Sequence, residues 1–160
     1  MKGILKKIFL PLCFYYTIEI NLPDNNIIKN DQSLSDIKVM VVDDNQYNRE
    51  IACELLRENG AHIIECASGS EAVDYIKYRN GIVDIILMDV CMPDMDGFEA
   101  TRLIRQLEKD RWQDIPIVAM TANAFDEDRK KALEHGMNGH IAKPFDIDTF
   151  AETVLEYVKY

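Results

Sequence analysis

The stretch DIILMDVCMPDMDGFEATRLIR, residues 84–105, contains the signals that decide the fold. It begins inside an apolar run, 82–88, which is typical of a strand buried on both faces of a sheet. A turn containing Pro, Asp and Gly follows, and side chains suited to a buried helix face then recur at three-residue steps from Phe98. Asp94 or Asp96 would cap that helix. The stretch therefore predicts one strand, a turn and one helix.

The same alternation of a short apolar run and an amphipathic stretch occurs five times. The runs are 37–42, 62–66, 82–88, 117–121 and 139–142. Further helix boundaries are marked by Asn45, Ser68 and Asp146 as starts and by Gly60, Gly81 and Gly136 as stops. This alternation implies right-handed crossovers and a parallel sheet with helices on both faces. The predicted fold class is α/β, a five-stranded, doubly wound parallel sheet.

Polar side chains stand at the carboxyl ends of four predicted strands. The first strand is followed by Asp43 and Asp44, the third by Asp89, the fourth ends at Thr121, and the fifth runs into Lys143. A parallel sheet brings these ends to one edge, where doubly wound folds bind their ligands. Three carboxylates, one hydroxyl and one ammonium are therefore expected in one cleft.

The chemistry of such a cluster is specific. Neighbouring carboxylates repel one another and raise one another's pKa, and a hard divalent cation such as Mg²⁺ or Mn²⁺ removes that conflict. With the cation in place, Asp89 can act as an oxygen nucleophile toward a phosphoryl group, which gives an aspartyl phosphate. The cation, Lys143 and Thr121 would contact the outer oxygens of that group.

Residues 37–160, about three-quarters of the chain, closely resemble the receiver domain of two-component response regulators, in particular the receivers of hybrid histidine kinases. The matching pieces are VVDDNQYNRE (41–50), DIILMDVCMPDMDGFEATRLIR (84–105), VAMTANAFDED (118–128) and GMNGHIAKPFD (136–146). The resemblance implies a (βα)5 flavodoxin-like fold with strand order 2-1-3-4-5. It also implies Mg²⁺-dependent phosphoryl transfer from a phosphohistidine.

The resemblance assigns roles at the acidic cluster. Asp89 is the phosphoacceptor and a metal ligand, Asp44 binds Mg²⁺ directly, and Asp43 binds it mainly through water. The backbone carbonyl of Cys91 completes the protein ligands. Cys91 and Asn123 also stand at the positions that tune loss of the phosphoryl group to water, and a thiol there predicts moderate or slow self-dephosphorylation.

The resemblance also assigns the residues that read the phosphoryl group. Thr121 senses it by hydrogen bonding and Lys143 pairs with it, and Pro144 follows a peptide bond that is typically cis in this family. The switch position, usually Tyr or Phe, is His140 here. Thr121 and His140 would link the site to a surface formed by the family's fourth helix, fifth strand and fifth helix.

Two other functions fit parts of the pattern. One is a phosphatase with an aspartyl-phosphate intermediate, but such enzymes usually have an acid two residues after the nucleophile, where Cys91 stands. The other is a receiver fold used only for docking, against which the complete acidic set argues. We therefore predict a phosphoacceptor signalling domain, not an enzyme, that assists its own phosphorylation and dephosphorylation.

The expected partners are proteins. The sequence ends at Tyr160, directly after the last predicted helix, which predicts a single-domain regulator or the terminal receiver of a hybrid kinase. A histidine kinase, a histidine-phosphotransfer protein, or both would exchange the phosphoryl group with it. A membrane would enter only through a parent kinase. The oligomeric state is left open, with a monomer as one option.

Residues 1–35 differ from the receiver-like residues 36–160. An apolar run, 8–20, is too short to span a membrane, no small-x-small signal-peptidase site follows it, and the polar tract 21–35 looks like a linker. Three interpretations stay open, namely a remnant or linker of a larger protein, a membrane-surface anchor, and a disordered tail. The first is favoured because residues 14–20 resemble the closing strand of a histidine-kinase ATPase domain.

Composition excludes several classes. The chain has 160 residues with 48% hydrophobic and 29% charged side chains, which is typical of a globular protein. Its net charge of −10 argues against nucleic-acid binding. Residues 1–35 carry four Lys against three acidic residues, so residues 36–160 hold −11. Four cysteines without CxxC spacing predict reduced, mostly buried thiols in a cytoplasmic protein. Trp112, in a polar segment, is expected to be partly exposed.

Overall fold

The protein was analysed as a computed structural model, which describes residues 34–79, 82–108, 110–122, 126–147 and 149–158. Five strands form one sheet in the order β2-β1-β3-β4-β5, and every neighbouring pair is parallel. The strands are β1 (Lys38–Val42), β2 (His62–Cys66), β3 (Ile85–Asp89), β4 (Ile117–Thr121) and β5 (Gly139–Ala142). The predicted fold class and strand order are confirmed.

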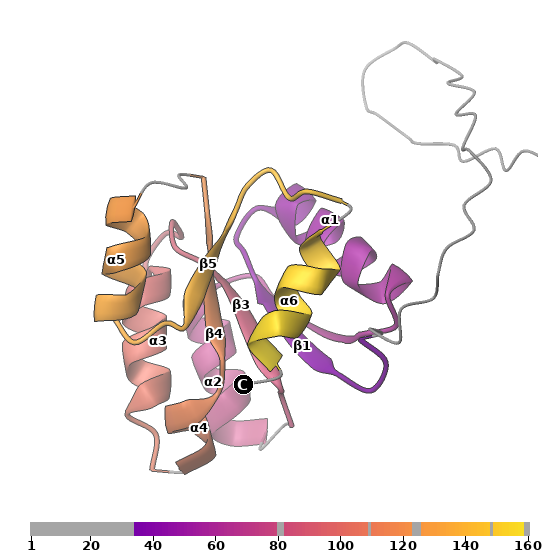
Figure 1. Cartoon of the computed structure of the whole chain (residues 1–160). Coiled ribbons are helices and arrows are strands. Elements are labelled where there is room, and N and C mark those ends of the chain that lie inside the picture. The colour runs from indigo at the N-terminus through magenta and orange to yellow at the C-terminus, as the bar shows by residue number, and fades with distance from the viewer. Residues whose placement is uncertain (1–33, 80–81, 109, 123–125, 148, 159–160) are drawn as a thin grey trace, which may run out of the picture. The chain divides into compact units, whose positions relative to one another are not determined.

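Helices cover both faces of this sheet (Figure 1). They are α1 (Gln46–Glu58), α2 (Gly69–Arg79), α3 (Gly97–Arg105), α4 (Asp110–Asp114), α5 (Asp126–Glu134) and α6 (Phe150–Val158). Helices α1 and α6 bury apolar side chains against one face, whereas α2, α3, α4 and α5 contribute to the core on the other. The short α4 was not predicted, so the family's fourth and fifth helices correspond to α5 and α6.

Several predicted features fall outside the described residues. They are residues 1–33 of the N-terminal segment, including Cys13, the predicted helix stop Gly81 and the predicted tuning residue Asn123. The described part of the fold begins with Leu34, whose side chain is 1% exposed and whose backbone bonds to Asn59 and Ile37. The packed domain therefore includes at least one residue before the predicted boundary at 36. Within the described ranges, no helix is long and apolar enough to cross a membrane.

Helix boundaries follow the predicted signals. The side chain of Asn45 accepts hydrogen bonds from the first-turn amides of α1. Asp96, rather than Asp94, caps α3 in the same way, while Asp94 lies in the preceding turn with a positive φ of 64°. Gly60 and Gly136 follow α1 and α5 with φ of 90° and 87°, a conformation that costs glycine little.

The largest difference from the predicted strand boundaries is at the start of β3. The apolar run was expected to begin a strand at Ile82, but β3 begins at Ile85 and Ile82 is 55% exposed. The carboxylate of Asp84 accepts a hydrogen bond from the backbone amide of Lys38 at 2.8 Å. The side chain of Asp84 therefore pairs with the first backbone amide of β1, and the ladder between β1 and β3 begins one residue later.

The prediction for Trp112 is wrong. This side chain is 2% exposed and belongs to the same buried cluster as Ile104 and Ile115. Trp112 lies in the five-residue helix α4, whose sequence is otherwise polar. One apolar residue in so short a helix produces no periodic pattern, so sequence alone did not show that it turns inward.

Arg105 at the end of α3 ties together three segments near the amino ends of β4 and β5. Its guanidinium donates to the carbonyl of Gly136 at 3.1 Å, to the carbonyl of Trp112 at 2.9 Å and to Oδ1 of Asn138 at 3.0 Å. The same Asn138 oxygen accepts the backbone amide of Ile117 at 2.8 Å. Burial lowers the pKa of Arg105, as expected for a desolvated cation held mainly by neutral acceptors.

Arg105→Ala should lower the free energy of unfolding by about 2–3 kcal/mol, because three acceptors lose a charged donor. Arg105→Lys should recover only part of this loss, since one ammonium cannot match the planar fork. Urea unfolding with an unchanged m-value is the measurement. The matched control is Arg102→Ala, whose side chain is 54% exposed on the same helix and should change stability by less than about 0.5 kcal/mol. Equal losses in the two variants would contradict the prediction.

Candidate active site at the carboxyl edge of the sheet

Three carboxylates meet where β1 and β3 end. Oxygens of Asp43, Asp44 and Asp89 all lie within 4.8 Å of one another. Asp43 is fully buried and Asp89 is 6% exposed, whereas Asp44 is exposed. The cluster therefore has a closed floor and an open side, as a site for a cation and an incoming group requires.

Lys143 supplies the cation of this cluster. Its Nζ lies 2.6 Å from Oδ2 of Asp43 and 2.9 Å from Oδ1 of Asp89, and its side chain is only 14% exposed. The backbone amide of Lys143 donates to the carbonyl of Thr121 at 2.7 Å, and the bond to Pro144 is cis, as the resemblance implies. One ammonium among three carboxylates leaves two negative charges uncompensated, which matches a divalent ion.

Backbone amides aim two of the carboxylates. The amide of Asn45 donates to Oδ1 of Asp43 at 2.9 Å, and the amide of Cys91 donates to Oδ1 of Asp89 at 3.3 Å. Both oxygens of Asp43 are thus in use. Oδ2 of Asp89 accepts no hydrogen bond from any residue that the structure describes, so its lone pairs are available to a metal or a phosphorus atom.

Burial raises the pKa of Asp89, and the nearby charge of Asp43 raises it further. The hydrogen bond and the charge of Lys143 act in the opposite direction without cancelling the effect. Without a bound cation, the ionised carboxylate of Asp89 is therefore held at an energetic cost. Oxygen donors of this charge and spacing suit Mg²⁺ or Mn²⁺.

The turn after β3 packs tightly against Asp89. The amide of Gly97 donates to the carbonyl of Val90 at 3.1 Å, and a Cβ atom at Gly97 would overlap the carbonyl oxygen of Asp89. Only glycine allows this approach. The turn therefore holds Cys91 beside the acidic cluster, where its side chain is exposed.

The remaining predicted residues lie at different distances from this centre. Thr121 ends β4, beside β5 and hydrogen-bonded through its carbonyl to Lys143. His140 lies half-buried in the middle of β5, paired in register with Ala119. The cluster of charges thus consists of four of the predicted residues, whereas Thr121 stands at the end of β4 and His140 within β5.

Two residues that contact the main chain of the site were missed from sequence. Gly97 was part of a recognised turn, but its contact with Asp89 depends on three-dimensional packing. Arg49, in α1, donates from Nη1 to the carbonyl of Asp43 at 2.7 Å. To predict this contact, one would have to know which face of α1 lies toward the end of β1, and no local motif gives that information.

The thiols of the described residues fall into two kinds. Cys53 and Cys66 are buried, and burial together with Glu65 raises the pKa of Cys53 to about 12. Such thiols are unreactive. Cys91 alone among the described cysteines is exposed, and it stands next to the cluster.

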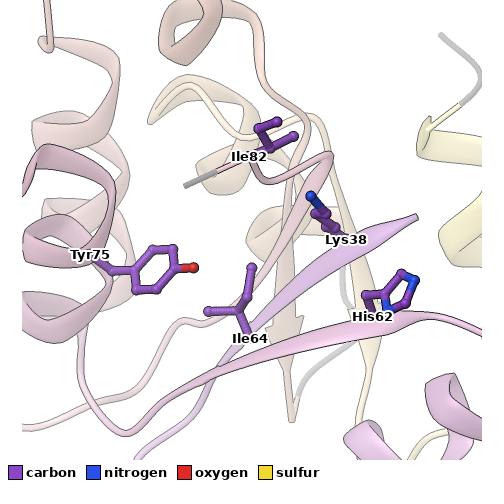
Figure 2. Close-up of a pocket in the computed structure, with 5 residues that line it drawn as sticks. All are labelled: Lys38, His62, Ile64, Tyr75 and Ile82. Atoms are coloured by element: carbon purple, nitrogen blue, oxygen red, sulfur yellow. The ribbon is translucent and has the colours of Figure 1, made fainter. Parts of the chain in front are cut away.

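The site does not coincide with an open hollow elsewhere on the described surface. That open hollow, of about 490 Å³, is lined by Lys38, His62, Ile64, Tyr75 and Ile82 (Figure 2). Lys38 and His62 begin β1 and β2, so the hollow lies toward the amino ends of these strands, away from the carboxylates. The chemistry of the cleft, rather than its size, identifies the site.

A doubly wound parallel sheet with a carboxylate–lysine cluster at its carboxyl edge defines an α/β domain that binds its ligand at the strand ends. Residues 39–155 match the family model described as response regulator receiver domain. The chain therefore belongs to the receiver-domain family of two-component phosphorelay signalling.

Curated relatives include much longer kinases. The signal transduction histidine-protein kinase BarA of Escherichia coli (strain K12) is 39% identical over 127 residues, which cover 79% of this chain and 13% of BarA. The CAI-1 autoinducer sensor kinase/phosphatase CqsS of Vibrio cholerae is 34% identical over 135 residues, covering 84% of this chain and 19% of CqsS. The chain spans less than a fifth of the length of either kinase.

Solved structures of receiver domains are also similar to this chain. The receiver domain of sensor histidine kinase PA1611 from Pseudomonas aeruginosa, with a magnesium ion coordinated in its active site cleft, shares 33% identity at a TM-score of 0.69. That match covers 78% of this chain and 98% of the other. The receiver domain of Saccharomyces cerevisiae Ssk1, crystallised with the histidine phosphotransfer protein Ypd1, shares 28% identity at a TM-score of 0.67, covering 77% and 89% of the two chains.

Asp89→Asn should raise the metal-free Tm by about 2–4 °C, the shift that roughly 1 kcal/mol produces in a domain of this size. The amide keeps the shape of the side chain and removes the buried charge. Mg²⁺ at a hundredfold excess over its Kd should stabilise the wild type by about 2.7 kcal/mol and the variant by clearly less. Thermal unfolding with and without Mg²⁺ measures both effects.

Asp94→Asn is the control, because Asp94 is exposed in the same turn and lies outside the carboxylate cluster. It should leave both the Tm and the Mg²⁺ effect unchanged. A lower metal-free Tm for Asp89→Asn would show that the charge of Asp89 stabilises the fold, contrary to the direction of its pKa.

Proposed function

We propose that this receiver accepts a phosphoryl group on Asp89 from a phosphohistidine, in a reaction that requires Mg²⁺. The observation that carries the proposal is the single ammonium of Lys143 within 3 Å of both Asp43 and Asp89, beside a third carboxylate. This arrangement supports the proposal because a carboxylate oxygen, an ammonium and a net negative charge suited to a divalent metal lie close together at one partly exposed edge of the sheet.

The metal would be held by carboxylates of Asp43, Asp44 and Asp89 together with the backbone carbonyl of Cys91. Bound there, it would supply Lewis-acid stabilisation of the transferred group. The carboxylates lie close enough to share one ion, and the exposed side at Asp44 leaves room for water ligands.

The transfer step follows from the groups in place. Oδ2 of Asp89 attacks the phosphorus, the P–N bond to the donor imidazole breaks, and the imidazole leaves with the electron pair and takes up a proton. Lys143 then pairs with an outer phosphoryl oxygen, and the Thr121 hydroxyl donates to another. Most of the catalysis is positioning and charge stabilisation, since the transition state is loose.

The chain is proposed to act as a phosphoacceptor rather than a hydrolase. Cys91 stands where an aspartyl-phosphate phosphatase would have its second acid, and a thiol there cannot act as that acid. The output surface is proposed to be α5, β5 and α6, reached from Thr121 through His140. Phosphorylation of the chain within a larger kinase and phosphorylation as a separate regulator would both use the same site.

Incubation with acetyl phosphate and Mg²⁺ should add one phosphoryl group to the wild-type chain, measured as intact mass. The adduct should be absent in EDTA and in Asp89→Asn, and hydroxylamine should remove it, as expected of an acyl phosphate. Asp94→Asn is again the control and should be labelled like the wild type. A labelled Asp89→Asn variant would place the phosphoryl group on another residue and contradict the proposal.

Exposed apolar side chains beside the site suggest where a phosphodonor protein docks. Tyr47 and Ile51 lie one turn apart near the start of α1, 68% and 53% exposed, and Ile147 in the loop after β5 is 72% exposed. Large exposed apolar groups next to a reactive site are typical of protein interfaces. The Ssk1 receiver was crystallised with such a partner, the phosphotransfer protein Ypd1.

Replacing both Tyr47 and Ile51 by Ala should slow phosphoryl transfer from a phosphorylated histidine-phosphotransfer protein about tenfold or more, since each contact side chain is worth about 1 kcal/mol or more. Labelling by acetyl phosphate should stay unchanged, because the small donor needs no docking surface. The control is Tyr78→Ala with Leu133→Ala, which removes equally exposed groups from α2 and α5. Equal transfer rates in the two double variants would contradict this surface.

A further inference from the structure

Arg49 is a largely buried cation that lies behind the acidic cluster. Its side chain is 16% exposed, and Nη1 donates to the backbone carbonyl of Asp43 at 2.7 Å. Its Nε lies 3.6 Å from Oε2 of Glu65 on β2. Arg49 thus contacts the main chain of the metal-binding segment and none of its carboxylates in the described contacts.

The carbonyl that Arg49 holds belongs to the peptide that joins Asp43 to Asp44. Because a peptide unit is planar, fixing this oxygen fixes the direction in which Asp44 leaves the strand. The Asp44 carboxylate itself accepts no hydrogen bond from any described residue. Its aim toward the cluster therefore depends on the backbone, and the charge-assisted bond from Arg49 is the strongest restraint on that peptide.

The Arg49 side chain also has an acidic neighbour, Glu65, besides the Asp43 carbonyl. Glu65 lies between Arg49 and Arg57, whose Nη2 is 2.6 Å from Oε1 of Glu65. The Arg57 pair is roughly half exposed and contributes little to stability. Glu65 lies on β2, 3.6 Å from Arg49, so β2 orients the guanidinium that holds the end of β1.

We propose that Arg49 is a positioning residue for the metal site: its bond to the Asp43 carbonyl aims the Asp43 and Asp44 carboxylates at the divalent ion. This inference rests on the proposed function, since it concerns the cation that supports phosphoryl transfer.

The charge of Arg49 and its proposed positioning role predict opposite effects on Mg²⁺ binding when the side chain is removed. As a nearby positive charge, Arg49 repels Mg²⁺, so its removal would tighten Mg²⁺ binding. As a positioning residue, Arg49 preorganises two ligands, so its removal weakens Mg²⁺ binding. The sign of the change in Kd therefore separates the two roles.

The experiment is isothermal titration of the full chain with Mg²⁺, alongside thermal unfolding without metal and acetyl-phosphate labelling across a range of Mg²⁺ concentrations. Arg49→Gln should raise the Mg²⁺ Kd about tenfold, the size of effect seen for groups that orient metal ligands. Labelling should be slow at low Mg²⁺ and approach the wild-type rate at saturating Mg²⁺. Arg49→Lys, which keeps the charge and one donor, should be intermediate.

The matched control is Arg57→Gln, which removes a cation from the same Glu65 but does not touch Asp43. Its Mg²⁺ Kd should stay within about twofold of the wild type. An Arg49→Gln variant with tighter or unchanged Mg²⁺ binding overturns the inference, and a lower metal-free Tm with unchanged Kd would assign Arg49 a purely structural role.

The two proposals fail in different ways. If the wild type binds Mg²⁺ but is not labelled at Asp89, the proposed function fails while the Kd comparison still decides the role of Arg49. If the wild type binds no Mg²⁺, both fail.

Discussion

The rest of this structure depends on the confinement of three carboxylates and one ammonium at the carboxyl edge of the sheet. Three like charges within 4.8 Å are unfavourable unless a cation neutralises them, and Lys143 neutralises only part of the charge. The parallel sheet imposes this crowding because it brings the ends of β1, β3 and β5 together. The fold thus stores an electrostatic conflict at one edge, which a divalent cation would resolve.

The two ends of the sheet serve different purposes. At the amino ends of β4 and β5, Arg105 satisfies three neutral acceptors and joins α3, α4 and the segment before β5. At the carboxyl ends, burial raises the pKa of Asp89, so the native state carries a charge that it does not fully solvate. Stability is therefore concentrated away from the site, which leaves the carboxyl edge able to respond to its ligands.

Sequence predicted the features that depend on local pattern. The strands were found from their apolar runs. The caps Asn45 and Asp96 and the residues of the acidic cluster were found because each stands at a strand end or a helix start. The missed features depend on packing between segments. Trp112 turns inward from a helix too short to show a period, Asp84 replaces a ladder bond, and Arg49 and Gly97 act through main-chain oxygens to which no motif refers.

Lys143 is shared between two carboxylates, and this sharing has a thermodynamic consequence. Asp43 and Asp89 are the residues that would hold a divalent cation, and their binding to it would free the Lys143 ammonium to pair with a phosphoryl group. Each ligand would therefore remove the competitor of the other. By reciprocity, the factor by which Mg²⁺ strengthens binding of the phosphodonor must equal the factor by which the donor strengthens binding of Mg²⁺. Under the proposed function, the site would therefore respond fully only when metal and phosphodonor are present together.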